Sequence, residues 1–162
     1  MPRIRLVYLR SAPQHVGAEV IYYERVKALL EIGRTAAIRQ DCLVDTGAIL
    51  SVFPQIVWTN FEREIDWLYD PASGRALPNW LGKVTGLGAQ PIDCRIGKIR
   101  IQIVELPLAV PTPLRSPAFE ILAKFPYDNG LYSQILLGLG GRGGLAWKIV
   151  VDSANAQAWL EQ

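Results

Sequence analysis

The segment that decides the fold reads Cys42-Leu43-Val44-Asp45-Thr46-Gly47-Ala48. Its apolar start is typical of a buried strand, and that strand delivers an acidic residue, Asp45, into a tight turn. A carboxylate at the end of a buried strand must be hydrogen-bonded, paired or protonated, because an isolated charge in apolar surroundings is costly. The threonine supplies a hydroxyl group and the glycine permits close backbone approach, so both favour a fixed carboxylate. Asp45 is therefore our candidate for one half of a catalytic pair.

Short apolar segments separated by turns continue on both sides of this motif. Residues 18–32 and 36–44 predict a hairpin about Gly33, and residues 49–53 predict a short returning strand. Further strands are expected at residues 3–9, 93–95, 98–102, 119–125, 134–138 and 145–151, the second and third of them on either side of a turn at Gly97. The sequence thus predicts an all-β fold.

Two helices are expected beside these strands. Pro54 is well placed to open the first, over residues 54–69. Its apolar residues recur at helical spacing, at Val57, Phe61, Ile65 and Leu68. The second would begin at Asp152 or Ser153 and run through Leu160.

Length and composition restrict the class of protein. With 162 residues, half of them hydrophobic, the chain predicts a single domain over residues 1–162. The formal net charge is +2 and the 17 basic residues are scattered, so we expect no nucleic-acid partner. No apolar run approaches the roughly 20 residues of a membrane span, and the first residues lack the order of a signal peptide. We therefore expect no membrane association and a cytoplasmic location.

Cysteine and histidine are too scarce for several kinds of site. Cys42 and Cys94 lie far apart in the sequence and predict buried, reduced thiols rather than a disulfide framework. His15 is the single histidine, so we expect no zinc site and no Ser/His/Asp or Cys/His mechanism. The sequence indicates neither a metal nor a cofactor.

At Asp45 the sequence resembles a known family. The turn, followed by Ser51-Val52-Phe53-Pro54, resembles the active-site turn of retropepsin-like (retroviral-type) aspartic proteases, which include retroviral proteases and single-domain bacterial relatives. Ala48 follows Asp-Thr-Gly as in the retroviral type. Ile135-Leu136-Leu137-Gly138 is similar to the family's second signature, which crosses behind the catalytic turn, and residues 84–89 fall where the family places its flap. The resemblance spans about residues 20–152.

The resemblance implies a fold and an activity. The fold would be a partly closed β-barrel of the acid-protease type, with one or two short helices and one lobe per chain. Because the chain has one Asp-Thr-Gly, the resemblance implies a homodimer in which Asp45 meets its symmetry mate. That pair would activate a water molecule and hydrolyse bonds in a peptide or protein substrate, making the chain an aspartic endopeptidase without a cofactor. The implied site residues are Asp45 as the catalytic residue, Thr46, Gly47 and Ala48 in the active-site turn, Thr85, Gly86, Leu87 and Gly88 in the flap, and Leu136, Leu137 and Gly138 in the second signature.

Four of these residues have family roles that the resemblance carries over in more detail. Thr46 would cross-link the two turns of the dimer by hydrogen bonds. Gly47 would allow close approach of the substrate, and Leu87 with Gly88 would contact it from the flap tip.

Other interpretations remain open at this stage. Asp45 could simply stabilise a β-turn. Asp152-Ser153-Ala154 could supply a second aspartate within one chain, although alanine stands where the signature has glycine. Ile49 and Leu50 after Ala48 depart from the family pattern, as does the glycine-rich segment 139–144. A non-catalytic peptide-binding or assembly domain on the same fold is therefore the alternative function.

A nucleotide-binding loop is a further alternative. Gly138-x-Gly140-x-x-Gly143 follows an apolar strand, as such a loop would. The motif also requires a helix, another strand and an acidic residue about 20 positions further on. Only 19 residues follow Gly143, and residues 147–151 favour a strand, so the sequence favours a turn there.

Overall fold

A computed structural model describes residues 3–35, 38–45, 48–85, 90–105, 112–138 and 148–161. The elements, in chain order, are β1 (Arg3–Arg10), β2 (Gln14–Val16), β3 (Glu19–Ile21), β4 (Glu24–Ile32), β5 (Ile38–Asp45), β6 (Ser51–Val52), α1 (Gln55–Trp58), the 3-10 helix η1 (Thr59–Glu64), β7 (Asp66–Tyr69), the 3-10 helix η2 (Pro71–Ser73), α2 (Asn79–Gly82), β8 (Lys83–Val84), β9 (Ile92–Val104), β10 (Phe119–Pro126), β11 (Ile135–Gly138), β12 (Lys148–Asp152) and β13 (Gln157–Glu161). Strands dominate, and the predicted all-β class is confirmed.

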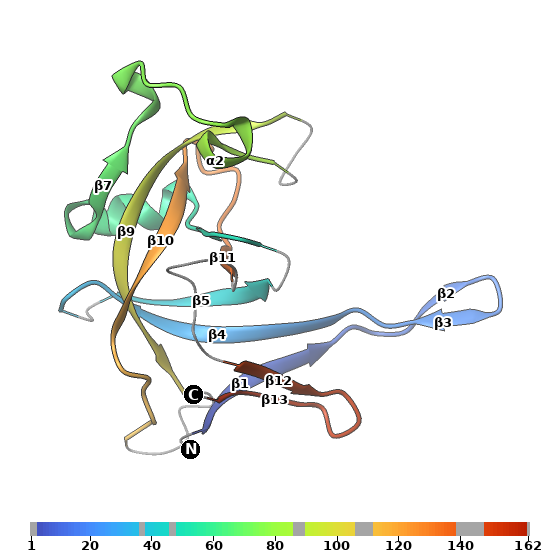
Figure 1. The fold of residues 1–162 in the computed structure, drawn as a ribbon. Helices are drawn as coiled ribbons and strands as arrows, with labels where there is room; N and C mark the ends of the chain where they lie inside the picture. Colours follow the sequence, from blue (N-terminus) through green and yellow to red (C-terminus); the bar gives the residue numbers. More distant parts are fainter. Residues whose placement is uncertain are drawn as a thin grey trace.

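One large mixed sheet organises the chain (Figure 1). Its strand order is β12-β13-β1-β4-β5-β11-β6-β10-β9-β7, with β8 paired to β9. The sheet bends back on itself, because β4 pairs with β9 at Leu29–Val104 and Ile32–Ile101 as well as with β1 and β5. The result is a partial ring of strands around a shared interior.

The interior of this ring is filled by aliphatic and aromatic side chains. Leu30, Ile103 and Leu137 are almost fully buried there, and the ring of Phe53 stacks on that of Phe125 at a centroid distance of 5.5 Å. The indole N–H of Trp58 donates to the carbonyl oxygen of Pro126 at 3.0 Å, so its polar atom is satisfied inside the core. Apolar burial on this scale is the main stabilising contribution to the fold.

The two cysteines are buried free thiols, as the sequence predicts. Cys42 belongs to the main core, and Cys94 to a smaller cluster with Val52 and Val84. Burial raises the pKa of Cys42 to about 12 and that of Cys94 to about 11. Both groups are therefore protonated and unreactive at neutral pH.

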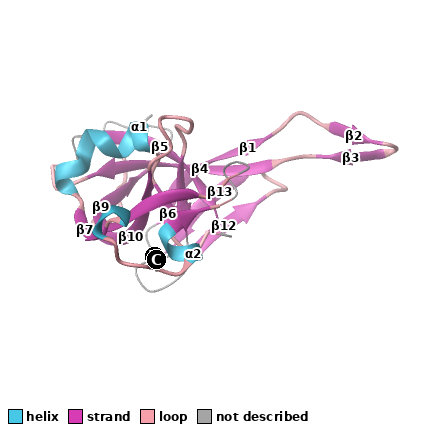
Figure 2. Cartoon of the chain, turned by 90° about the horizontal axis from the view of Figure 1, so that it is seen from above, coloured by secondary structure: helices cyan, strands magenta, loops and turns pink. Residues whose placement is uncertain are grey.

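An arm projects from the body of the molecule (Figures 1 and 2). β1 and β4 pair antiparallel as far as Arg10 and Glu24, and the chain between them continues outward as the two-stranded β2–β3 hairpin. Hydrogen bonds between Ser11 and Tyr23 connect the two sides of this projection at its base. We call residues 11–23 the arm.

The predicted helix over residues 54–69 is correct only in its first turn. After α1 the chain tightens into η1, where Phe61 has non-helical dihedral angles, and Asp66–Tyr69 forms strand β7. Val57, Phe61 and Ile65 do face the core, but Leu68 is 50% exposed. Pairing of β7 with the free edge of β9 replaces the last turns of the helix.

Two further predictions fail for similar reasons. Residues 92–104 form one continuous strand, and Gly97 lies in its middle rather than at a turn. A Cβ atom at Gly97 would lie 2.6 Å from Ile65 Cγ2 and 2.9 Å from the carbonyl oxygen of Asp66, so glycine is needed there for close approach of β7. The predicted C-terminal helix is strand β13, whose Ala158 and Leu160 alternate into the core.

No helix within the described ranges is long and apolar enough to cross a membrane.

Candidate active site

Asp45 is the last residue of β5, which lies between β4 and β11. Cys42 is in the core and Val44 packs against it. Since side chains alternate along a strand, Leu43 and Asp45 project from the opposite face. The N–H of Ala48 donates to the Asp45 carbonyl oxygen at 3.3 Å, so the chain turns directly after the carboxylate. Asp45 is partly buried at this turn.

β11 passes between the strands that enter and leave the Asp45 turn. It runs parallel to β5, with Gly138 opposite Asp45, and antiparallel to β6, with Leu136 opposite Val52. The N–H of Gly138 also donates to the buried hydroxyl of Ser51 at 3.1 Å. The segment that resembles the second signature therefore crosses next to the segment that resembles the first.

Gly138 touches the chain that follows the turn. A Cβ atom at this position would lie 2.7 Å from the carbonyl oxygen of Ala48 and 2.8 Å from the carbonyl carbon of Leu50. Backbone atoms at these distances leave no space for a side chain. Glycine at position 138 thus determines how closely β11 supports the Asp45 turn.

Leu136 and Leu137 point to opposite faces of β11. Leu137 is 1% exposed in the main core, whereas Leu136 packs against the small cluster of Val52, Val84 and Cys94. Leu136 also lines a cavity with Asp45. One residue of the second signature therefore stabilises the interior, and the other forms part of the candidate site.

The cavity beside Asp45 has a volume of about 490 Å³. Its walls come from β1, β4, β5, β11 and β12, which are far apart in the sequence but meet at this end of the sheet. Most of the lining side chains are apolar. The lining residues are Tyr8, Glu24, Arg25, Val26, Leu43, Val44, Asp45, Leu136 and Val151.

Glu24 is the second carboxylate of this cavity, and it is already engaged. It accepts hydrogen bonds from Arg10 Nη2 at 2.8 Å and from Ser153 Oγ at 2.9 Å. Its hydrogen bonds with Tyr8, Arg10 and Ser153 lower the pKa of Glu24. Glu24 is therefore held as an ionised group at the base of the arm.

The base of the predicted flap is a short hairpin. β8 pairs with the start of β9, Lys83 with Asp93 and Val84 with Ile92. Val84 is buried against Val52 and Cys94, the cluster that Leu136 also contacts. Thr85 is exposed just beyond β8. Gly86, Leu87 and Gly88 lie outside the described residues.

Lys124 holds the base of this hairpin through a hydrogen bond. Its Nζ donates to the carbonyl oxygen of Lys83 at 2.8 Å, and burial lowers the pKa of Lys124. Its strand β10 pairs with β6 on one side and with β9 on the other. The base of the hairpin and the strand after the Asp45 turn are therefore joined through β10.

The other predicted site residues have mixed outcomes. Thr46 and Gly47 lie outside the described residues, and Ala48 is partly buried beside Gly138. Asp152 stays in its own turn, where it accepts hydrogen bonds from Asn155 N at 3.1 Å and Asn155 Nδ2 at 2.7 Å, which lower its pKa. Its neighbour Val151, and not Asp152, lines the Asp45 cavity. Asp152 therefore does not supply the second aspartate within one chain.

The nucleotide-loop alternative also lacks its structural context. Most of the glycine-rich segment lies outside the described residues, but the chain beyond it continues as strands β12 and β13. A dinucleotide-binding loop needs a helix at that position.

Sequence reasoning missed the part of the cavity that comes from β1, β4 and β12. Tyr8, Glu24 and Val151 line the same cavity as Asp45 because β1 pairs with β4 and β12 joins the same sheet through β13. The turn signals at Pro13 and Gly17 between two apolar segments could have indicated the first pairing.

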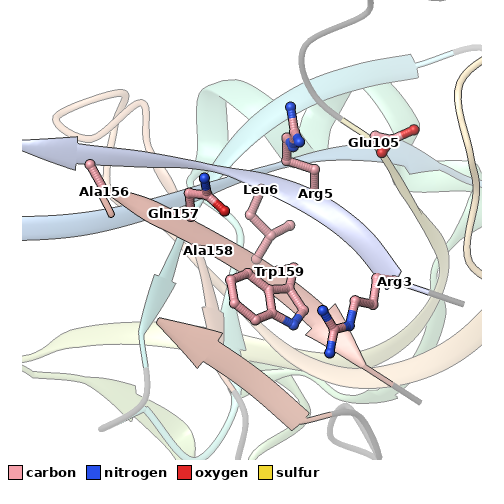
Figure 3. A pocket seen from close by; sticks show the side chains of 8 residues that line it. All are labelled: Arg3, Arg5, Leu6, Glu105, Ala156, Gln157, Ala158 and Trp159. Atoms are coloured by element: carbon pink, nitrogen blue, oxygen red, sulfur yellow. The ribbon is translucent and has the colours of Figure 1, made fainter. Parts of the chain in front are cut away.

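A second cavity of about 350 Å³ lies where β1 and β13 pair (Figure 3). Arg3 lies beside the Trp159 indole, 5.1 Å from the ring centroid, and is paired with Glu161 at 2.9 Å. Asp45 is not among its lining residues. In the part of the chain that is described, no three His, Cys, Asp or Glu residues cluster as metal ligands.

Comparison of the chain with protein-family models, with curated proteins and with solved structures gave no match in any of the three.

Proposed function

We propose that this chain is an aspartic endopeptidase of the retropepsin-like kind, in which two copies form one active site. The fold would then be one lobe of an acid-protease-type barrel. The observation that carries the proposal is the position of Asp45: it ends β5 where β11 crosses between β5 and β6, with Gly138 against the turn. This arrangement places the Asp45 turn against closely packed backbone and Asp45 itself in the lining of a cavity.

Glu24 is bound to Arg10 and Ser153, and this favours a second copy of the chain as the source of the second catalytic carboxylate. An aspartic peptidase needs two carboxylates that share a proton. In this cavity Glu24 is bound to Arg10 and Ser153 and its pKa is lowered, which keeps it charged and fixed. The second acid would therefore be Asp45 of a second chain, across a two-fold axis.

The chemistry follows from placing two carboxylates in contact. Two carboxylates in contact cannot both be ionised without strong repulsion, so they share one proton and one acts as the acid while the other acts as the base. The ionised Asp45 takes a proton from a water molecule, which adds to the carbonyl carbon of the peptide bond. The protonated Asp45 donates to the carbonyl oxygen. Proton transfer to the leaving nitrogen then allows the carbon–nitrogen bond to break, with no cofactor. The pKa values belong to the pair.

The cavity suits a peptide in an extended conformation. Apolar side chains from four strands, among them Val26, Leu43, Leu136 and Val151, line the same cavity as Asp45. Such walls favour apolar side chains of a substrate. The β8–β9 hairpin, anchored on the same Leu136 cluster, would cover the substrate from one side.

The proposal is tested by changing the charge of one side chain. Asp45→Asn keeps the shape of the residue but removes the acid, so cleavage of a mixed peptide library should fall by about 10⁴-fold or to background. Products should be followed by mass spectrometry from acidic to neutral pH. Asp41→Asn is the matched control, because Asp41 lies on the same strand with an exposed side chain. Its turnover should be unchanged.

Both variants should keep the fold and the dimer of the wild-type chain. Equal turnover by the Asp45→Asn variant and the wild type would contradict the proposal. Saturable peptide binding with no products from the wild type would instead favour a non-catalytic peptide-binding or assembly domain.

A further inference from the structure

We propose that the arm, residues 11–23, is a clasp that docks on a second copy of this chain. The inference rests on the proposed function, because it uses the position of the second Asp45. It goes further by assigning the contact that holds the two copies together to a segment that lies mostly before residues 20–152, the part that resembles retropepsin-like proteases.

The arm extends from the same end of the β4–β5 pair at which Asp45 lies. In the antiparallel pair β4–β5, Lys27 is opposite Leu43, so β4 toward its start runs in the direction in which β5 reaches Asp45. β4 begins at Glu24, and the arm lies immediately before it (Figure 1). A second copy that brings its Asp45 into contact with the first must therefore occupy the space beside the arm.

The arm exposes more apolar surface than a solvated hairpin needs. Five of its side chains are between 41% and 62% exposed: Val16, Val20, Ile21, Tyr22 and Tyr23. All residues of β2 and β3 are exposed, on both faces of the hairpin. An isolated two-stranded hairpin is at best marginally stable in water. An ordered arm of this composition is expected to have a partner surface.

The arm also carries too few charged residues to prevent its strand edges from pairing with another chain. Exposed strand edges usually carry lysines, other charges or prolines that prevent pairing with another chain. The arm contains no Lys or Arg, Glu19 is its single acidic residue, and its one proline, Pro13, precedes both strands of the hairpin. An edge of this kind favours association.

The size of the arm fits a dimer. At about 3.3 Å per residue, the seven residues from Ser11 to Gly17 span on the order of 20 Å. The exposed parts of the five apolar side chains amount to on the order of 400 Å² per arm. If each of two arms covers an equal area of its partner, the interface buries about 1,600 Å², the size of a standard stable complex. A two-fold arrangement uses both arms and leaves none exposed.

The arm also connects the interface to the candidate site. Tyr8, Glu24 and Arg25, at the base of the arm, line the Asp45 cavity. Glu24 is bound there by Arg10, which also lies 5.4 Å from the ring centroid of Tyr22. Docking of the arm would therefore fix one wall of the cavity at the same time as it brings the second Asp45.

The test places charge on one face of the arm. Val16→Glu with Ile21→Glu changes two residues that share a face, because Val16 pairs with Glu19 and Gln14 with Ile21. Dimer dissociation constants from sedimentation should rise about 100-fold or more. Ile56→Glu with Leu131→Glu is the matched control: both residues are exposed apolar side chains outside the arm, and two charges are added. The control should dimerise like the wild type.

A shortened arm gives a second, independent variant. Replacing residues 13–21 by Asn-Gly closes the hairpin beside the Ser11–Tyr23 hydrogen bonds and leaves the body intact. This variant should be a folded monomer. A wild-type monomer at micromolar concentrations, or dimers of unchanged affinity in both arm variants, would overturn the inference.

Peptide cleavage separates this inference from the proposed function. An arm-dependent dimer that cleaves no peptide would support the clasp and count against the peptidase. Arm variants that still dimerise and still cleave through Asp45 would overturn the clasp and leave the peptidase standing.

Discussion

At the scale of single residues, Glu31 shows how this fold uses buried charge. It lies in β4, 3% exposed, where the strand pairs with both β5 and β9 and closes the partial ring. Its carboxylate is held by Arg39 at 2.8 Å and by Arg115 at 3.0 Å. The hydrogen bonds from Arg115 and then Arg39 lower the pKa of Glu31, although burial opposes them. The charge is tolerated because both arginines are in contact with it.

Glu31→Gln should therefore reduce stability in a pH-dependent way. A lowered pKa in the folded state means that the stabilisation is full above the unfolded value of 4.5 and is lost as the pH falls through the folded value. We expect a loss of about 2 kcal/mol in the free energy of unfolding at pH 7. The difference from the wild type should shrink below pH 4.5. Urea denaturation at several pH values measures both quantities.

The control for this experiment is Glu120→Gln. Glu120 pairs with Lys98 at 3.5 Å, and both side chains are about half exposed. Surface pairs of this kind contribute little, so the change should stay within about 0.5 kcal/mol at every pH. A loss in the Glu31→Gln variant that is the same at pH 3 and pH 7 would contradict the assignment.

At the scale of elements, β11 is the strand on which the candidate site depends. It is four residues long, yet it contacts β5, β6, the main core and the Asp45 cavity. Gly138 ends it against the backbone of Ala48 and Leu50. Strand and turn are therefore coupled by close backbone packing rather than by a side chain.

Gly138→Ala should disturb the Asp45 turn. The new methyl group would lie within 3 Å of three backbone atoms, so the chain must shift, at a cost of about 1–3 kcal/mol. Peptide cleavage should fall by at least about tenfold while the protein remains folded. Gly82→Ala is the control, since its Cβ atom would lie 3.5 Å from Leu77 Cβ, an ordinary contact. Thermal melts and turnover are compared for both variants. Unchanged turnover with Gly138→Ala would show that the support of the turn is not needed.

The elements also show what a sequence pattern can and cannot predict. The strand ending at Asp45, the hairpin before it and the strand at residues 135–138 were predictable, because each has a continuous apolar segment beside a turn. The end of the helix after Trp58 was not, because the apolar spacing of Phe61 and Ile65 suits both a helix and the observed path. The outcome depended on pairing with β9 at Gly97, a contact distant in sequence.

Contacts between segments distant in sequence also decide which residues form the candidate site. Asp45 and Gly138 could be identified from local motifs, whereas Glu24 and Val151 enter the cavity through the pairing of β1 with β4 and of β12 with β13. The turn signals at Pro13 and Gly17 indicate the first pairing at best, and no local pattern encodes the second. The buried ion pair of Glu31 with Arg115 joins residues 84 positions apart, so no local sequence pattern could predict it either.

At the scale of the whole molecule, two features point to the same arrangement. Asp45 lies at one end of the sheet beside a carboxylate that is already engaged, and the apolar arm extends beyond that end. A two-fold dimer would complete the acid pair and cover the arm together. The proposed activity is then a property of the assembly, and it should depend on chain concentration.

Mixed dimers test the central claim, that two Asp45 residues from two chains form one site. Wild-type and Asp45→Asn chains are refolded together at constant total concentration, and peptide cleavage is measured against the wild-type fraction. If both carboxylates are required, activity follows the square of that fraction, so an equal mixture retains about one quarter of the activity. Mixtures with Asp41→Asn chains should lose none. A linear dependence, with one half of the activity retained in the equal mixture, would show that one chain suffices and would contradict the account.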